Sequence, residues 1–171
     1  LWSNLDPDYW YLMDSLNLIS GNWPKHVAHP GTTVQWIGAL IIKATLPFTE
    51  LHDLKIIVLS EPEKYLSIIV YFFIILNTVA LIVVGAICNL VLRDLIAAIL
   101  IQMGPFLSKL TFKWTLHVSP EPLLVTTVLI LAIITIFSLR DGQLEKHGAR
   151  YATAFAILAG FGMVTKVTSA G

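Results

Sequence analysis

The chain has 171 residues, of which 56% are hydrophobic and 13% are charged. Eleven Lys and Arg balance eleven Asp and Glu, so the formal net charge is zero. The zero charge excludes the basic excess typical of a nucleic-acid-binding domain, and the hydrophobicity excludes a disordered chain. The single cysteine, Cys88, excludes an internal disulfide and a cysteine-based zinc site. The composition therefore indicates an integral membrane protein.

Residues 1–64 form a first region that holds four of the five tryptophans. The run Asp6-Pro7-Asp8 predicts the start of a helix, because Asp is a good capping residue and Pro favours the first helical position. Apolar residues follow at helical spacing, and Gly21 predicts the end of that helix.

A second short helix is expected over residues 34–46, after a turn at 29–31. Its apolar stretch is short for a membrane span and carries Gln35 and Lys43. We therefore expect it to lie in the membrane interface, with Ile37 and Ile41 toward lipid. A re-entrant hairpin with residues 54–59 is the alternative.

Four apolar segments follow, and a spanning helix needs about 20 such residues. The strongest is the run 66–92, while Gly104-Pro105 interrupts the next segment and predicts a kink there. The expected spans are 65–92, 94–112, 122–139 and 150–168.

The charges flanking these spans predict an orientation. All three arginines and Lys146 fall on one side of the predicted topology, which the positive-inside rule makes cytoplasmic. Residues 1–64 and 113–122 are then expected to face outward.

Three acidic residues are candidates for proton transfer, namely Asp6, Asp8 and Glu121. The predicted topology places all three at the outer membrane surface, where carboxylates from separate segments could act as a general base and an orienting charge. The alternative is that each acid only stabilises the N-terminus of its helix.

Two lysines, Lys109 and Lys166, are candidates for contact with a phosphate at the membrane interface, and His29 is a candidate for a ligand contact. For the lysines, the alternative is that each extends along a helix end toward the membrane surface. His26 and His29 have a spacing compatible with metal binding, but no carboxylate is adjacent to them. The sequence contains no metal motif, and it leaves a divalent cation open as a cofactor.

The order of these motifs resembles a known family. The stretch Asp6-Pro7-Asp8-Tyr9, followed by His29-Pro30-Gly31-Thr32-Thr33, is similar to the first outer loop of bacterial glycosyltransferases with the GT-C fold. These include aminoarabinose transferases and protein mannosyltransferases. The resemblance implies a transmembrane helix bundle with amphipathic helices in a long first outer loop.

The resemblance also implies roles for individual residues. Asp8 matches the catalytic base of the family, Asp6 is the other candidate in that motif, and Glu121 matches the acid of the second outer loop. His29 matches a loop residue near the donor phosphate, and Thr165-Lys166 matches the end of a span.

The implied function is the transfer of a sugar from a polyprenyl phosphate to an acceptor at the outer surface of a bacterial inner membrane, with Asp8 as general base. The implied partners are the lipid bilayer and the polyprenyl-phosphate donor. We expect the chain to be the N-terminal portion of a longer protein, because it begins at Leu1 and ends directly after an apolar segment. The alternative is a non-catalytic subunit packed against other membrane subunits. A small transporter is a third interpretation, but no predicted span carries an acidic residue in its interior.

Overall fold

The computed structural model describes residues 7–25, 32–140 and 142–166, apart from the side chains of Leu110, Phe112 and Lys166. Over these residues the chain is helical and contains no strand, which confirms the prediction of an all-α protein. The helices, in chain order, are α1 (Pro7–Ile19), α2 (Thr32–Thr45), α3 (Leu51–Ser60), α4 (Pro62–Leu92), α5 (Leu95–Met103), the 3₁₀ helix η1 (Gly104–Leu107), α6 (Lys109–Trp114), α7 (Pro120–Ser138) and α8 (Gln143–Lys166).

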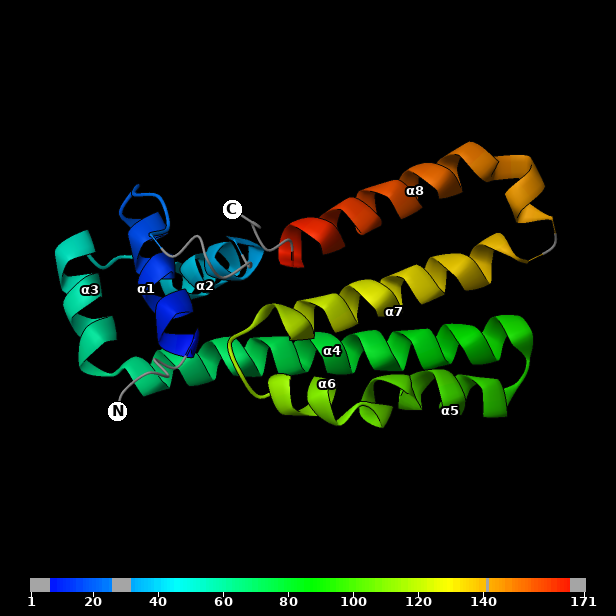
Figure 1. The fold of residues 1–171 in the computed structure, drawn as a ribbon, viewed down its shortest axis with the longest axis horizontal. Coiled ribbons are helices and arrows are strands. Elements are labelled where there is room, and N and C mark those ends of the chain that lie inside the picture. The colour runs from blue at the N-terminus through cyan, green and yellow to red at the C-terminus, as the bar shows by residue number, and fades with distance from the viewer. Residues whose placement is uncertain (1–6, 26–31, 141, 167–171) are drawn as a thin grey trace.

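Helix α4 is the longest element and runs the length of the molecule (Figure 1). Its 31 residues extend about 46 Å at 1.5 Å per residue. It ends at Arg93, which has a left-handed backbone conformation with φ 53°. Asp94 then begins α5, because its Oδ1 accepts hydrogen bonds from the backbone N–H groups of Ile96 at 2.9 Å and Ala97 at 3.1 Å.

The remaining helices are arranged around α4. Helices α1, α2 and α3 gather at the end where α4 begins, α5 to α6 return along one side of α4, and α7 runs along another (Figure 1). Helix α8 comes back beside α7 and ends near α2. One end of the molecule therefore holds residues 7–25, 32–64 and 113–122 together with the end of α8. The other end holds residues 93 and 142–150.

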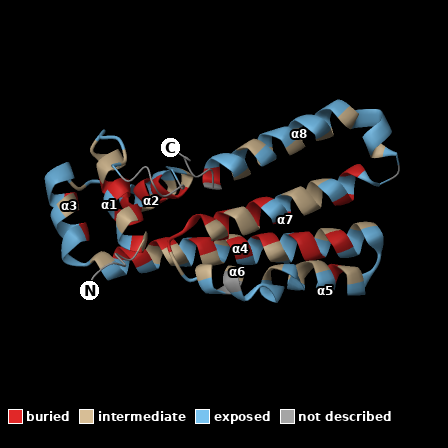
Figure 2. Ribbon diagram, in the orientation of Figure 1, coloured by how far each residue is buried: buried red, intermediate tan, exposed pale blue. Residues whose placement is uncertain are grey.

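Among the described residues, two helices are long and apolar enough to cross a membrane, Pro62–Leu92 and Glu121–Ser138. From its second quarter onward, helix α4 also exposes apolar side chains at helical spacing, those of Tyr71, Ile75, Val79, Ile82 and Leu90. Figure 2 shows that exposed and buried positions alternate along this helix. A continuous exposed apolar stripe is expected where a helix contacts lipid rather than water. These features agree with the class of protein that the composition indicates.

The other two expected spans have a different local structure. Residues 95–107 form a shorter apolar segment that is divided at Gly104, where the sequence predicts a kink. Helix α8 has a break of its own at His147, where φ is −132° and ψ is 28°. Whether α5 to α6 and α8 cross a membrane stays a prediction.

The buried residues form two clusters, and α4 contributes to both. One lies at the α1–α2 end and includes Phe73 and Ile69 of α4. The other lies between α4, α5 and α7 and includes Val84 and Cys88 of α4. In the spanning region, Thr126 donates a hydrogen bond from its hydroxyl to Asn77 Oδ1 at 2.8 Å, which links α7 to α4.

Helix α2 packs differently from the expectation. Ile37 and Ile41, which we expected to face lipid, are half-buried and pack against the first core cluster. The apolar side chains that α2 exposes are those of Trp36 and Leu40, and Lys43 is exposed beside them as expected. The buried side of α2 packs against α1, and this packing decides which side of α2 is exposed.

The arrangement of the two ends predicts a labelling pattern. In a Cys88→Ala background, Asn22→Cys and Glu145→Cys each introduce one exposed thiol, at opposite ends of the molecule. In intact cells, we expect a membrane-impermeant maleimide to label Asn22→Cys and not Glu145→Cys. Equal labelling of both thiols before lysis would contradict the orientation.

A neighbouring pair of phenylalanines tests the packing at the start of α4. Phe73 is fully buried in the first core cluster, whereas Phe72 is 41% exposed. We expect Phe73→Ala to lower the free energy of unfolding by about 3–5 kcal/mol, because it leaves a cavity. Phe72→Ala is the matched control and is expected to cost much less in a thermal unfolding assay in micelles. Similar losses from both variants would show that the cluster does not hold the helix.

Candidate functional site

Asp8 lies in the first turn of α1 and is buried. Tyr11 and Leu12, three and four residues later, are also buried, so these positions share the inward face of the helix. The inward face carries the Asp8 carboxylate toward the connection between α6 and α7. There Asp8 Oδ2 lies 3.1 Å from Nδ1 of His117.

His117 belongs to residues 115–119, the connection that leads into α7. Its backbone N–H donates a hydrogen bond to the carbonyl oxygen of Trp114 at 3.2 Å. The ring centroids of Trp114 and His117 are 5.4 Å apart. The next residue, Val118, is buried in the first core cluster, so the connection is anchored on both sides of the histidine.

Glu121 lies in the first turn of α7, and its charge acts on the same residue as that of Asp8. Burial raises the pKa of the Tyr11 phenol above its ordinary value, and the negative charges of Glu121 and Asp8 raise it further. Tyr11 therefore stays protonated and able to donate a hydrogen bond at neutral pH. The structure brings Asp8 and Glu121, from segments 113 positions apart, close enough to one phenol to influence it.

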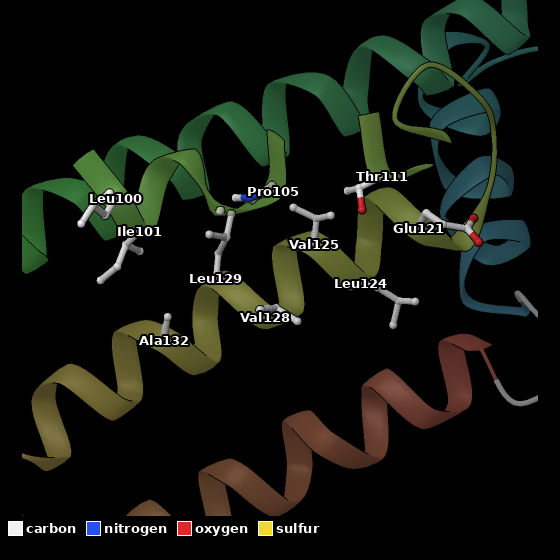
Figure 3. Close-up of a pocket in the computed structure, with 11 residues that line it drawn as sticks. Leu100, Ile101, Pro105, Thr111, Glu121, Leu124, Val125, Val128, Leu129 and Ala132 are labelled. Carbon is white, nitrogen blue, oxygen red and sulfur yellow. The ribbon is translucent and has the colours of Figure 1, made fainter. Parts of the chain in front are cut away.

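Glu121 also lines an apolar cavity of about 570 Å³ between α7 and the segment α5 to α6 (Figure 3). Thr111 and Glu121 lie at one end of it. The walls are otherwise apolar, formed by Leu100, Ile101, Gly104, Pro105, Leu124, Val125, Val128, Leu129 and Ala132. This volume is within the range of small-molecule sites, and the lining suits a hydrocarbon chain.

Asp8 lines a different cavity, of about 280 Å³, together with Glu63, Leu116 and residues of α4. At this cavity the Tyr9 hydroxyl donates a hydrogen bond to Glu63. The sequence led us to expect that Asp8 and Glu121 act together at the outer membrane surface. Of the cavities described, each acid lines its own, and Tyr11 is the neighbour on which both charges act.

The remaining candidate residues are less informative. Lys109 is exposed at the start of α6, the helix whose Thr111 lines the larger cavity. Asp6, His29 and the side chain of Lys166 lie outside the described residues. Within the described part of the chain, no group of three or more His, Cys, Asp and Glu side chains is placed to hold a metal ion.

The start of α2 and the end of α8 are joined by a contact between two threonines. The hydroxyl of Thr33, at the start of α2, donates a hydrogen bond to Oγ1 of Thr165 at 3.2 Å. Thr165 is fully buried and also donates to the carbonyl oxygen of Phe161 at 2.8 Å. The end of α8 is thereby held against α2.

Sequence reasoning missed a buried carboxylate, Asp14. Its Oδ2 accepts a hydrogen bond from Gln35 Nε2 at 3.0 Å, and its Oδ1 accepts one from the backbone N–H of Lys25 at 2.9 Å. The residue ties α1 to α2 and to the chain that follows α1. Its position between Leu12 and Leu16, on an apolar helix face, is the signal that could have identified it.

Comparison with protein-family models, curated proteins and solved structures finds no match for this chain.

The raised pKa of Tyr11 predicts a dependence of stability on pH. Above about pH 10 the phenol ionises in the unfolded chain but stays protonated in the folded one, so the free energy of unfolding falls as pH rises. We expect Tyr11→Phe to lose less stability than the parent between about pH 8 and pH 11. Thermal unfolding at the two pH values measures this, with the exposed Tyr71→Phe as control. Identical pH dependence in Tyr11→Phe and the parent would contradict the assignment.

Proposed function

We propose that this protein transfers a sugar from a polyprenyl-phosphate donor to a hydroxyl acceptor at the outer surface of a bacterial inner membrane, as part of a GT-C-like helix bundle. The observation that carries the proposal is the apolar cavity that Glu121 lines at one end, in a protein where Asp8 and Glu121 both act electrostatically on Tyr11. A lipid-linked substrate needs both an apolar binding surface and polar groups for chemistry at its end.

Asp8 acts as the general base in this proposal. Its carboxylate takes the proton of the acceptor hydroxyl while that oxygen bonds to the anomeric carbon of the sugar. The bond between this carbon and the phosphate oxygen breaks at the same time, and polyprenyl phosphate leaves. Attack opposite the leaving group inverts the configuration of the sugar carbon.

The charge that develops on the phosphate must be offset. Lys109 is the described basic candidate, because it is exposed on the helix whose Thr111 lines the larger cavity. His29 and Lys166 remain the candidates from sequence, and a divalent cation remains open. Tyr11 adds no charge near the two acids, because burial and their negative charges raise the pKa of its phenol.

In this proposal the larger cavity binds the lipid part of the substrate. Its apolar walls belong to α5, η1 and α7, so a hydrocarbon chain lying there buries surface against several helices at once. Glu121 and Thr111 mark the end at which the polar part of the substrate would lie (Figure 3). Glu121 belongs to residues 113–122, a segment that the predicted orientation would put on the outer side of the membrane.

Substitution of Asp8 tests the proposal. We expect Asp8→Asn to lower the rate of sugar transfer by about 10²–10⁴-fold, because the amide cannot accept the proton. The full chain is assayed in liposomes with a panel of polyprenyl-phosphate sugars. Asp53→Asn is the matched control, since Asp53 is an exposed acid in the first turn of α3.

Two results would count against the catalytic role. A rate for Asp8→Asn equal to that of Asp53→Asn, with unchanged thermal stability, would remove Asp8 as the base. Absence of transfer by the parent chain with every donor would favour the alternative of a non-catalytic membrane subunit, and co-purification of a stoichiometric membrane partner would then support that alternative.

A further inference from the structure

His117 links α1, which carries Asp8, to the connection before α7, the helix that carries Glu121. It contacts Asp8 across 109 positions of sequence, at 3.1 Å between Nδ1 and Oδ2. The Asp8 side chain is 13% exposed and that of His117 is 35% exposed. The contact is therefore shielded on the side of Asp8 and open to solvent on the side of His117.

The chemistry of the contact selects one form of the imidazole. An ionised carboxylate can only accept hydrogen bonds, so Nδ1 must carry the hydrogen atom. In the neutral ring, Nε2 then bears the lone pair. A free neutral imidazole can carry its hydrogen atom on either nitrogen. The hydrogen-bond partner of Nδ1 therefore decides the tautomer.

The imidazole ring is held in place by its own segment. Besides the contact with the Trp114 ring, the Trp114 carbonyl oxygen accepts hydrogen bonds from the His117 N–H and from the Ser119 hydroxyl, each at 3.2 Å. The backbone at His117 is thus held independently of Asp8, and the Trp114 ring packs beside the imidazole. A fixed donor restricts the carboxylate that it binds, because a carboxylate held through Oδ2 cannot rotate freely.

Resting on the proposed function, we propose that His117 is a positioning residue for Asp8. Its Nδ1–H group donates to Oδ2, fixes the carboxylate for proton transfer, and links α1 to the connection that leads into α7, whose first turn bears Glu121. Burial of Val118 holds the same connection, so the distinctive role of His117 is to orient the carboxylate. If the contact were only structural, its loss would lower the stability of the fold. The rate of sugar transfer by the folded protein would then not depend on how the Asp8 carboxylate is oriented.

The first experiment examines the tautomer and needs no sugar donor. The protein is labelled with ¹⁵N-histidine in micelles, and the His117 signals are assigned by their loss in His117→Asn. At a pH where the ring is neutral, we expect His117 in the Nδ1–H form, and a shift toward the Nε2–H form in Asp8→Ala. An Nε2–H form in the parent, or a tautomer unaffected by Asp8→Ala, would overturn the hydrogen bond.

The second experiment compares two substitutions at the same position. His117→Asn keeps an N–H donor close to the position of Nδ1, whereas His117→Leu keeps the bulk and removes the donor. We expect His117→Leu to lower kcat by roughly 10-fold to 100-fold with little change in KM, and His117→Asn to retain kcat within a few-fold of the parent. His52→Leu, at an exposed position of α3, is the control.

The outcomes separate the two proposals. Equal loss of kcat in His117→Asn and His117→Leu, or normal kcat in His117→Leu, would overturn the positioning role. If the parent transfers no sugar while the tautomer depends on Asp8, the proposed function fails and the hydrogen bond stands. If His117→Leu does not fold, the rate of His117→Asn and the tautomer of the parent still decide the matter, because a low rate or an Nε2–H ring contradicts the proposal.

Discussion

The packing of α4 is the interaction on which the rest of the structure depends. This helix supplies residues to both buried clusters, so the α1–α2 end and the α5–α7 bundle are joined through one continuous element. Its backbone satisfies its own hydrogen bonds over about 46 Å, which allows its side chains to be apolar on almost every face. Helix α1, which bears Asp8, packs mainly against α2 and meets α4 in the first buried cluster, which includes Phe73.

Polar side chains then specify how the helices meet. The Thr126–Asn77 hydrogen bond fixes the register of α7 against α4, and Gln102 donates to the carbonyl oxygen of Leu81 to fix α5 against the same helix. Asp14 does the equivalent for α1 and α2. Apolar contacts alone are tolerant of sliding, whereas each of these bonds is satisfied in only one arrangement.

The sequence predicts the features that depend on local chemistry. The long apolar run, the break at Gly104 and the short helix after residue 31 were expected close to their observed bounds, because length, proline and capping residues act within a few positions. The facing of Ile37 and Ile41, the Asp8–His117 contact and the separate cavities depend on which helices pack together. No local pattern contains that information, so His117 had no signal beyond its closeness to Glu121.

The break at Gly104 gives the larger cavity an unusual wall. One side is the single rod α7, and the other is built from short pieces, α5, η1 and α6, that meet at Gly104 and Ser108. Helix α5 is tied to α4, because Ala98 lies in the second buried cluster and Gln102 donates to the carbonyl oxygen of Leu81. The 3₁₀ helix η1 has no buried residue, so it is the part of this wall that could move without disturbing either buried cluster.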